Sequence, residues 1–564
     1  MNRRRIAALA AALAVAPLLA AAPHQRAEAD EPGGGRPSHP TGSHRTLGVD
    51  LDTVTIPELQ ARMKRGSLTS SALTEAYLRR IRDVDPKIHA VLRVSPTVRL
   101  QAAASDARHR RGTVRGPLDG IPVLLKDNVN TRDMPTTAGS LALALAGKPP
   151  ATDADLVTRL REAGAVVLGK ANMSEWANFR AERPTSGWSA VGGQTHNPYV
   201  LDRNPCGSSS GSAAALAASL AQVAIGTETD GSIVCPAGMN GVVGHKPSLG
   251  LVSRSGVVPI SAEQDTAGPM ARNVTDTALT LAVLAPDSGI AADTGLGADG
   301  GLLTDVRSAA NGGPGQADPL ARPGGPRGER IGGLRGKRIG LWRLPSLGTG
   351  VDALMTRTAT RLRDAGAQVV EVTPPYQERL AKLEFPALLS EFHRDIDAYL
   401  ATREGGPGDL AGLIEFNGAH PDEQTCFAGQ ELFEEALAAP STDDPGYRAM
   451  RAELSDLARR SIDETMAAHD LDALASPANP AAWPTDCARG DNDVIPSSTP
   501  AAVAGYPSLS VPAGFVGELP VGLLLMAGDR QDGALLSLGA AVEHRLDAWR
   551  APRYLPSVPD GASR

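Results

Sequence analysis

The sequence predicts a layered α/β protein, and three observations point to that fold class. Short apolar segments typical of strands alternate with segments that have the apolar period of helices. The chain has 564 residues, enough to bury a large core without disulfide or metal support. Hydrophobic residues make up 42% and charged residues 21%, an ordinary globular composition that excludes a wholly disordered chain.

The predicted elements begin at Thr55, which can cap a helix whose first turn accommodates Pro57. A second helix over 70–82 carries an apolar stripe that includes Leu73 and Tyr77. Strands and helices then alternate along the chain. Further helices are predicted at 96–111, 154–163, 212–220 and 351–365, and strands at 88–94, 120–127, 166–169, 223–226, 338–341 and 369–372.

Charge and composition exclude several kinds of partner. The chain has 56 Lys+Arg against 63 Asp+Glu and no basic block, so we expect no binding to nucleic acid. Aromatic residues make up only 3%, which argues against stacking platforms for bases or sugars. No cysteine spacing resembles a zinc site, and we expect neither a metal nor a cofactor.

The N-terminus has the layout of a secretory signal. Arginines at 3–5 precede an apolar run over 6–22, and two Ala-x-Ala sites follow. A signal peptide over 1–29, a flexible linker over 30–48 and a secreted or extracytoplasmic protein are predicted. The alternative is a membrane anchor, which the short run disfavours, so we expect no stable membrane association after signal removal. The export route stays open.

The rest of the chain is expected to form one domain. That domain covers 49–555, and its segment 288–335, rich in Gly, Ala, Pro, Asp and Arg, predicts a disordered insertion. We expect a monomer.

Export would permit disulfides among the four cysteines. Cys426 and Cys487 lie in polar, loop-like sequence and are the better candidates for a bridge. Cys206 and Cys235 are expected to be small buried thiols.

Two loops of small residues carry the strongest chemical signal. The first is Gly207–Ser212, before an Ala-rich helix, and the second is Gly226–Ser232, after a strand. Free N–H groups at such positions stabilise negative charge, although each loop alone could be a packed turn. Neither matches a phosphate-binding loop or the G-x-S-x-G elbow. A Ser-His-Asp triad with His196 or His245 stays open.

Together with a lysine motif, these loops resemble the amidase signature of serine hydrolases. The lysine motif is Gly120–Val129, and the second serine motif continues through Ile233 to 241–247. The resemblance covers about 54–545. It implies the amidase-signature fold, in which helices cover both faces of a mixed central β-sheet. The departures are Cys206 and Ser210, where glycine is common, and His245, where a longer apolar residue is usual.

The resemblance also implies a Ser-cisSer-Lys triad. Ser232 matches the nucleophile, Ser208 the serine on a cis peptide bond, and Lys126 the general base. Ser208 would relay the proton of Ser232 to Lys126, which must be neutral to accept it. Ser209 matches a position that forms hydrogen bonds around the lysine. The backbone N–H groups of the oxyanion hole would come from Thr229, Asp230, Gly231 and Ser232.

The segments 172–180, 186–189 and 192–195 look most like those of bacterial peptide amidases, as does 430–433. Those enzymes remove the C-terminal amide of peptides and release ammonia. Candidate substrate contacts are Met173, Ser174, Trp176 and Phe179, of which the aromatic residues could equally be core.

Two other functions stay open beside peptide amide hydrolysis. A broad amidase for small aliphatic or aromatic amides is the alternative, and a non-catalytic exported binding protein is the remote one. The related chain of glutamyl-tRNA amidotransferase needs cytoplasmic partners, which export contradicts. The acidic residues Glu431, Glu434 and Glu435 are expected to form a solvated helix face.

Overall fold

A computed structural model describes residues 45–46, 48–288, 333–491 and 496–559. The predicted signal peptide, most of the predicted linker and nearly all of the predicted insertion lie outside these residues. In the described part of the chain, no helix is both long and apolar enough to cross a membrane.

The structure is built on a mixed 11-stranded sheet within the described ranges, which confirms the predicted fold class. Parallel pairs lie near both ends of the sheet, and antiparallel pairs join them through the middle. In spatial order the strands are β12 (Gln368–Glu371), β11 (Arg338–Leu341), β13 (Ala473–Pro477), β15 (Leu519–Met526), β14 (Ser508–Val516), β9 (Val243–Lys246), β10 (Thr266–Ala271), β8 (Val223–Glu228), β4 (Pro122–Lys126), β5 (Val166–Ala171) and β3 (Val91–Val94).

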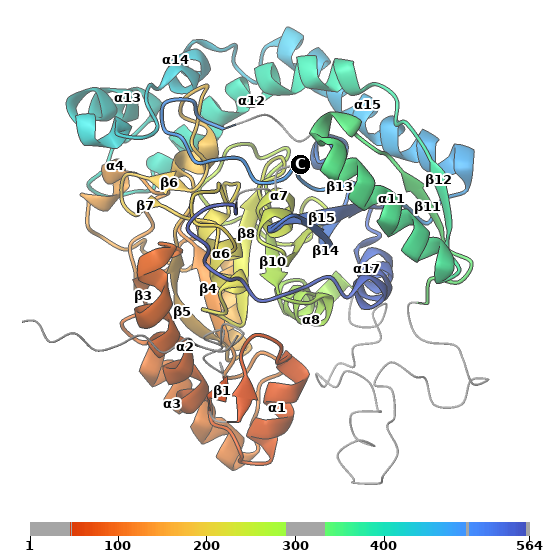
Figure 1. Ribbon diagram of the computed structural model, residues 1–564. Coiled ribbons are helices and arrows are strands. Elements are labelled where there is room, and N and C mark those ends of the chain that lie inside the picture. The colour runs from red at the N-terminus through yellow and green to blue at the C-terminus, as the bar shows by residue number, and fades with distance from the viewer. Residues whose placement is uncertain (1–44, 47, 289–332, 492–495, 560–564) are drawn as a thin grey trace, which may run out of the picture. The chain divides into compact units, whose positions relative to one another are not determined.

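Helices cover the sheet, and α12 to α15 lie together at the top of Figure 1. Two small sheets pair β1 (Arg45–Thr46) with β2 (Val49–Asp50) and β6 (Trp188–Ser189) with β7 (Gly193–Gln194). The helices are α1 (Ile56–Lys64), α2 (Ser70–Val84), α3 (Val98–Arg111), α4 (Leu141–Ala144), α5 (Asp155–Glu162), α6 (Ser210–Ala217), α7 (Val234–Met239), α8 (Val274–Leu284), α11 (Thr349–Asp364), α12 (Gln377–Leu400), α13 (Leu410–Ala419), α14 (Glu431–Ala438), α15 (Pro445–His469), α16 (Thr499–Ala504) and α17 (Asp532–Leu546).

Strand β14 shows how both faces of the sheet are covered. Leu509 packs against Gly539 of α17 so closely that a Cβ on this glycine would clash with it. The next residue, Ser510, points to the opposite face, as alternation along a strand requires. There a Cβ on Gly522 would lie 2.6 Å from Ser510 Oγ and 2.9 Å from Gly238 Cα in α7. The central strands are therefore buried on both faces, which fits the continuous apolar run of β15.

Most predicted elements lie within a few residues of their observed bounds, and the exceptions have local causes. The strand predicted at 88–94 begins only at Val91. Its first residues form a turn in which His89 adopts φ 50° and Asp85 Oδ1 accepts hydrogen bonds from the N of Ala90 and Val91. The helix predicted at 212–220 begins earlier, at Ser210, whose Oγ donates to the carbonyl of Cys206 at 2.6 Å.

The cysteines give one confirmed prediction and one wrong one. Cys426 and Cys487 form a disulfide, as predicted. Cys206 and Cys235 are not thiols but a second disulfide, with their Cα atoms 6.1 Å apart. The expectation failed because these residues are distant in sequence, whereas the start of α6 and the start of α7 are adjacent in the fold.

Candidate active site

Lys126 is the last residue of β4, and its side chain is fully buried. Its Nζ donates hydrogen bonds to Ser208 Oγ at 2.7 Å, to Thr227 Oγ1 at 2.8 Å and to Thr227 O at 3.3 Å. Thr227 belongs to β8, which pairs in parallel with β4. Neighbouring parallel strands therefore bring the lysine motif to the strand that leads into the second serine motif.

Burial lowers the pKa of Lys126 to about 7, because the ammonium form loses its hydration inside the protein. The carboxylates of Asp265 and Glu228 act in the opposite direction, but burial is the larger effect. A lysine with this pKa is neutral in a large fraction of molecules near pH 7, and the neutral amine can accept a proton.

The first serine motif is fixed by contacts on both sides. The peptide bond Gly207–Ser208 is cis, as the resemblance implies, and Ser208 is fully buried. Ser208 O accepts a hydrogen bond from Ser174 N at 3.1 Å. Ser209 Oγ donates to Thr227 O at 3.1 Å and accepts from Thr227 N at 3.2 Å. The motif is thereby attached to the residue that also holds Lys126.

Ser232 lies in the turn after β8 and is partly exposed. Its carbonyl accepts a hydrogen bond from Ser209 N at 3.2 Å, which joins the two serine motifs directly. Glu228 Oε2 accepts from the N of Ile233 at 2.7 Å and of Val234 at 3.0 Å. The backbone is therefore held on both sides of this serine.

The predicted oxyanion-hole residues Thr229, Asp230 and Gly231 complete the same turn, in which Gly231 adopts φ 77°. Thr229 Oγ1 donates to Asp265 Oδ1 at 2.5 Å. Asp230 Oδ2 accepts from Thr499 Oγ1 at 2.6 Å. Side chains from two distant segments thus anchor the turn.

A carboxyl pair next to this turn was not predicted. Glu384 of α12 shares a hydrogen bond with Asp230, and burial together with the second carboxyl group raises the pKa of Glu384 well above its ordinary value. Gln264 Nε2 donates to Glu384 Oε1 at 2.9 Å, and Arg451 donates to Gln264 Oε1 at 2.7 Å. Burial and the closeness of the two carboxyl groups therefore favour the protonated form of the pair. No local motif could have revealed it, because its partners come from separate segments.

The residues predicted to contact substrate are all buried: Met173, Ser174, Trp176 and Phe179. Ser174 supports Ser208 through the backbone hydrogen bond described above. Trp176 packs edge-on against Phe433, with ring centroids 6.0 Å apart, and Phe179 lies in the same apolar cluster. The structure places the two aromatic side chains in packing positions. Contact of any of the four residues with substrate stays a prediction.

Neither candidate histidine meets the serine motifs. His196 Nδ1 lies 2.8 Å from the carbonyl oxygen of Leu201, and His245 Nε2 lies 3.1 Å from Asp532 Oδ1. Among the described residues, neither ring forms a hydrogen bond with Ser208 or Ser232. The geometry therefore favours the lysine, not a histidine, as the base. The residues Glu431, Glu434 and Glu435 are exposed on α14, as expected.

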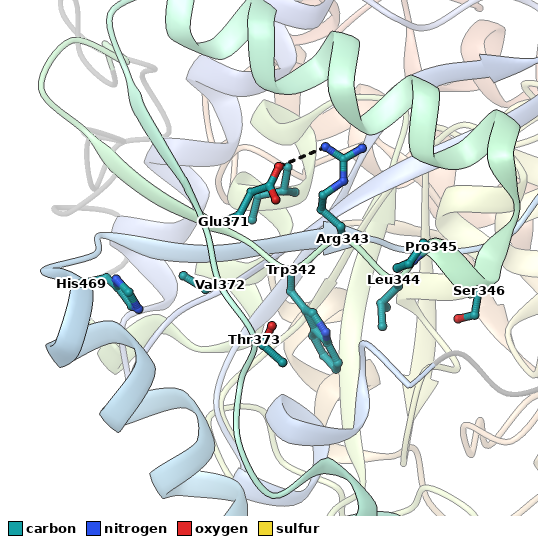
Figure 2. A pocket seen from close by; sticks show the side chains of 10 residues that line it. Trp342, Arg343, Leu344, Pro345, Ser346, Glu371, Val372, Thr373 and His469 are labelled. Carbon is teal, nitrogen blue, oxygen red and sulfur yellow. Dashed lines mark hydrogen bonds and ion pairs between the residues drawn. The ribbon is translucent and has the colours of Figure 1, made fainter.

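Figure 2 shows a surface pocket of about 500 Å³ that none of these residues lines. It lies beside β11 and β12, and Trp342, Arg343 and His469 line it. Arg343 is already paired with Glu371 at 3.2 Å. Six strand spacings separate β11 from β8, roughly 30 Å along the sheet, so the pocket takes no part in the site. Within the described ranges, no cluster of His, Cys, Asp and Glu could hold a metal ion.

The Cys206–Cys235 disulfide links the two serine motifs, because Cys206 lies just before Ser208 and Cys235 just after Ser232. Replacing both cysteines by serine is expected to lower stability by about 3–4 kcal/mol through a freer unfolded chain, and also to lower kcat. The matched control replaces Cys426 and Cys487 and should lower stability by a similar amount with kcat retained. Urea unfolding and initial rates measure both effects. Equal losses of kcat in the two variants would show that the Cys206–Cys235 disulfide has no special effect on catalysis.

Comparison with known proteins identifies the family of this chain. The family model described as Amidase matches residues 72–294 and 318–536. The crystal structure of native peptide amidase from Stenotrophomonas maltophilia has 48% sequence identity and a TM-score of 0.77, covering 89% of this chain and 98% of that one. An Arabidopsis thaliana protein named a probable amidase is 36% identical over 90% of this chain and 92% of its own length. A putative amidase of Schizosaccharomyces pombe is 33% identical, covering 90% of this chain and 88% of its own length.

The fold and the matched motifs define a hydrolase of the amidase-signature class. The chain belongs to the Amidase family, whose members hydrolyse amide bonds, and it is an enzyme that acts on such bonds.

Proposed function

We propose that this enzyme removes the C-terminal amide of peptides, using Ser232 as nucleophile, Ser208 as proton relay and Lys126 as base. The observation that carries the catalytic part is the 2.7 Å hydrogen bond between Lys126 Nζ and Ser208 Oγ, made by a lysine whose pKa is lowered to about 7. The likeness to the Stenotrophomonas maltophilia peptide amidase supports the choice of substrate.

The steps balance as an acyl transfer followed by hydrolysis. Ser232 Oγ attacks the carbonyl carbon while its proton passes through Ser208 to Lys126. Backbone N–H groups of 229–232 stabilise the oxyanion. The C–N bond then breaks, and the proton returns from Lys126 through Ser208 to the leaving nitrogen, which departs as ammonia. Water next attacks the acyl-enzyme and releases the peptide acid.

The protonation of Lys126 sets the expected pH dependence of the reaction rate. Only neutral Lys126 accepts a proton, so kcat/KM should rise about tenfold per pH unit below 7 and level off above it. Initial rates between pH 5.5 and 8.5 on one amidated peptide measure this profile. A rate that stays constant through this range would contradict Lys126 as the titrating base.

Ammonia release from a short amidated peptide tests the whole proposal. Mass spectrometry should show conversion of the amide to the acid with the internal peptide bonds intact. Ser232→Ala should abolish the release, whereas the surface variant Ser441→Ala should retain it. Turnover of a simple amide without turnover of the peptide would leave the mechanism and refute the peptide specificity. No turnover of either would support the non-catalytic alternative.

Extracytoplasmic localisation is part of the same proposal. Two disulfides support it, since such bonds persist where thiols are oxidised. Cell fractionation of a strain producing the full chain should place amidase activity outside the cytoplasm. A variant lacking residues 1–29 should keep the protein inside the cell, as immunodetection of the fractions would show. Equal distributions of the two proteins would refute the predicted signal peptide.

A further inference from the structure

Asn128 lies two residues after Lys126, and its side chain is on the same side of the strand end. Between them, Asp127 points the other way, where its carboxylate lies 3.3 Å from Lys170 Nζ. Asn128 Nδ2 donates to Thr227 Oγ1 at 2.9 Å, and that hydroxyl also receives the hydrogen bond from Lys126. The amide of Asn128 is therefore held beside the base.

The other half of that amide lacks a partner. Asn128 is only 3% exposed, and no atom of the described residues forms a hydrogen bond with its Oδ1. The backbone of Asn128 is fixed because Val258 N donates to Asn128 O at 2.8 Å, and the side chain is held by its Nδ2 hydrogen bond to Thr227. A buried carbonyl without a donor is unfavourable, so the site offers an acceptor that a donor from outside the protein can satisfy.

We propose that Asn128 Oδ1 accepts a hydrogen bond from the leaving nitrogen of the substrate carboxamide. This inference rests on the proposed function, in which that nitrogen receives its proton through Ser208 from Lys126. The leaving nitrogen must therefore lie on the side of the carbonyl where Lys126, Thr227 and Asn128 meet. A primary amide presents two N–H groups there, while the leaving oxygen of an ester presents none.

The contact would do two things. It would stop rotation of the –NH2 group and keep the nitrogen lone pair toward Ser208 Oγ, ready for the proton. It would also make Asn128 a determinant of amide over ester, because only the amide fills the empty acceptor.

The test compares a peptide amide with the methyl ester of the same peptide. Asn128→Ala should lower the amide-to-ester ratio of kcat/KM by about tenfold to a hundredfold. Asn128→Asp keeps an acceptor and should keep the ratio, although its charge beside Lys126 should move the pH inflection upward. Thr227→Val removes the hydroxyl that holds both Lys126 and Asn128, so it should lower both rates and also lower the ratio, by less than Asn128→Ala does.

Two results would overturn the inference. One is an unchanged ratio in Asn128→Ala, which would mean that Asn128 acts only by supporting Thr227. The other is an equally large fall of the ratio in Asn128→Asp. Labelling of Ser232 by a fluorophosphonate, followed to completion because a variant with a weakened base reacts slowly, counts the folded sites. A wild-type enzyme that hydrolyses neither substrate would refute the proposed function instead, so the two failures are distinguishable.

Discussion

Replacement of Lys126 by alanine is expected to lower kcat for amide hydrolysis by about 10²- to 10⁴-fold, the usual contribution of general acid–base catalysis. The loss follows from geometry, because Lys126 Nζ is bonded to Ser208 Oγ and to Thr227. Binding and the oxyanion donors remain, so the residual rate should exceed that of water alone.

Two further variants separate proton transfer from charge. Lys126→Arg keeps the positive charge but cannot act as a base, since a guanidinium does not lose its proton in proteins, and it should be as inactive as the alanine variant. Lys337→Ala removes a lysine paired with Asp472 on the surface and should retain full activity. Thermal unfolding shows whether each variant is folded. A folded Lys126→Ala enzyme within tenfold of the wild-type rate would refute the assignment.

Replacement of Arg180 by alanine is expected to lower the free energy of unfolding by about 3–5 kcal/mol. Its guanidinium and Glu175 are fully buried and joined by a 2.7 Å ion pair. Arg180 also donates to the carbonyls of Glu423, Phe427 and Gly429, so its removal leaves several buried acceptors without a donor. Burial raises the pKa of Glu175, and the positive charge of Arg180 opposes that rise by favouring the carboxylate.

The matched control is Arg99→Ala. Arg99 pairs with Glu75 at 2.6 Å, a similar distance, but its side chain is 71% exposed. Removal of this exposed pair should change stability by less than about 1 kcal/mol. Urea unfolding measures the loss of stability in each variant. Similar losses in both would show that burial does not decide how much these ion pairs contribute to stability.

Patterns local in sequence predicted the fold and part of the site. The apolar run that ends at Lys126 and the small-residue loops around Ser208 and Ser232 are each continuous, so one motif sufficed for each. Thr227 lies within a motif, yet only the pairing of β4 with β8 shows that it holds the lysine. Glu384 comes from a helix that no sequence pattern connected with the site, and the Cys206–Cys235 contact depends on how α6 and α7 pack.

The disulfide between the serine motifs has a consequence for when the enzyme matures. A newly made chain carries two thiols at these positions, and it must meet an oxidant before the motifs become covalently linked. The number of competent molecules then depends on thiol oxidation as well as on synthesis. In a reducing compartment the chain would persist in its unlinked form, so amides in that compartment would meet only this form of the enzyme.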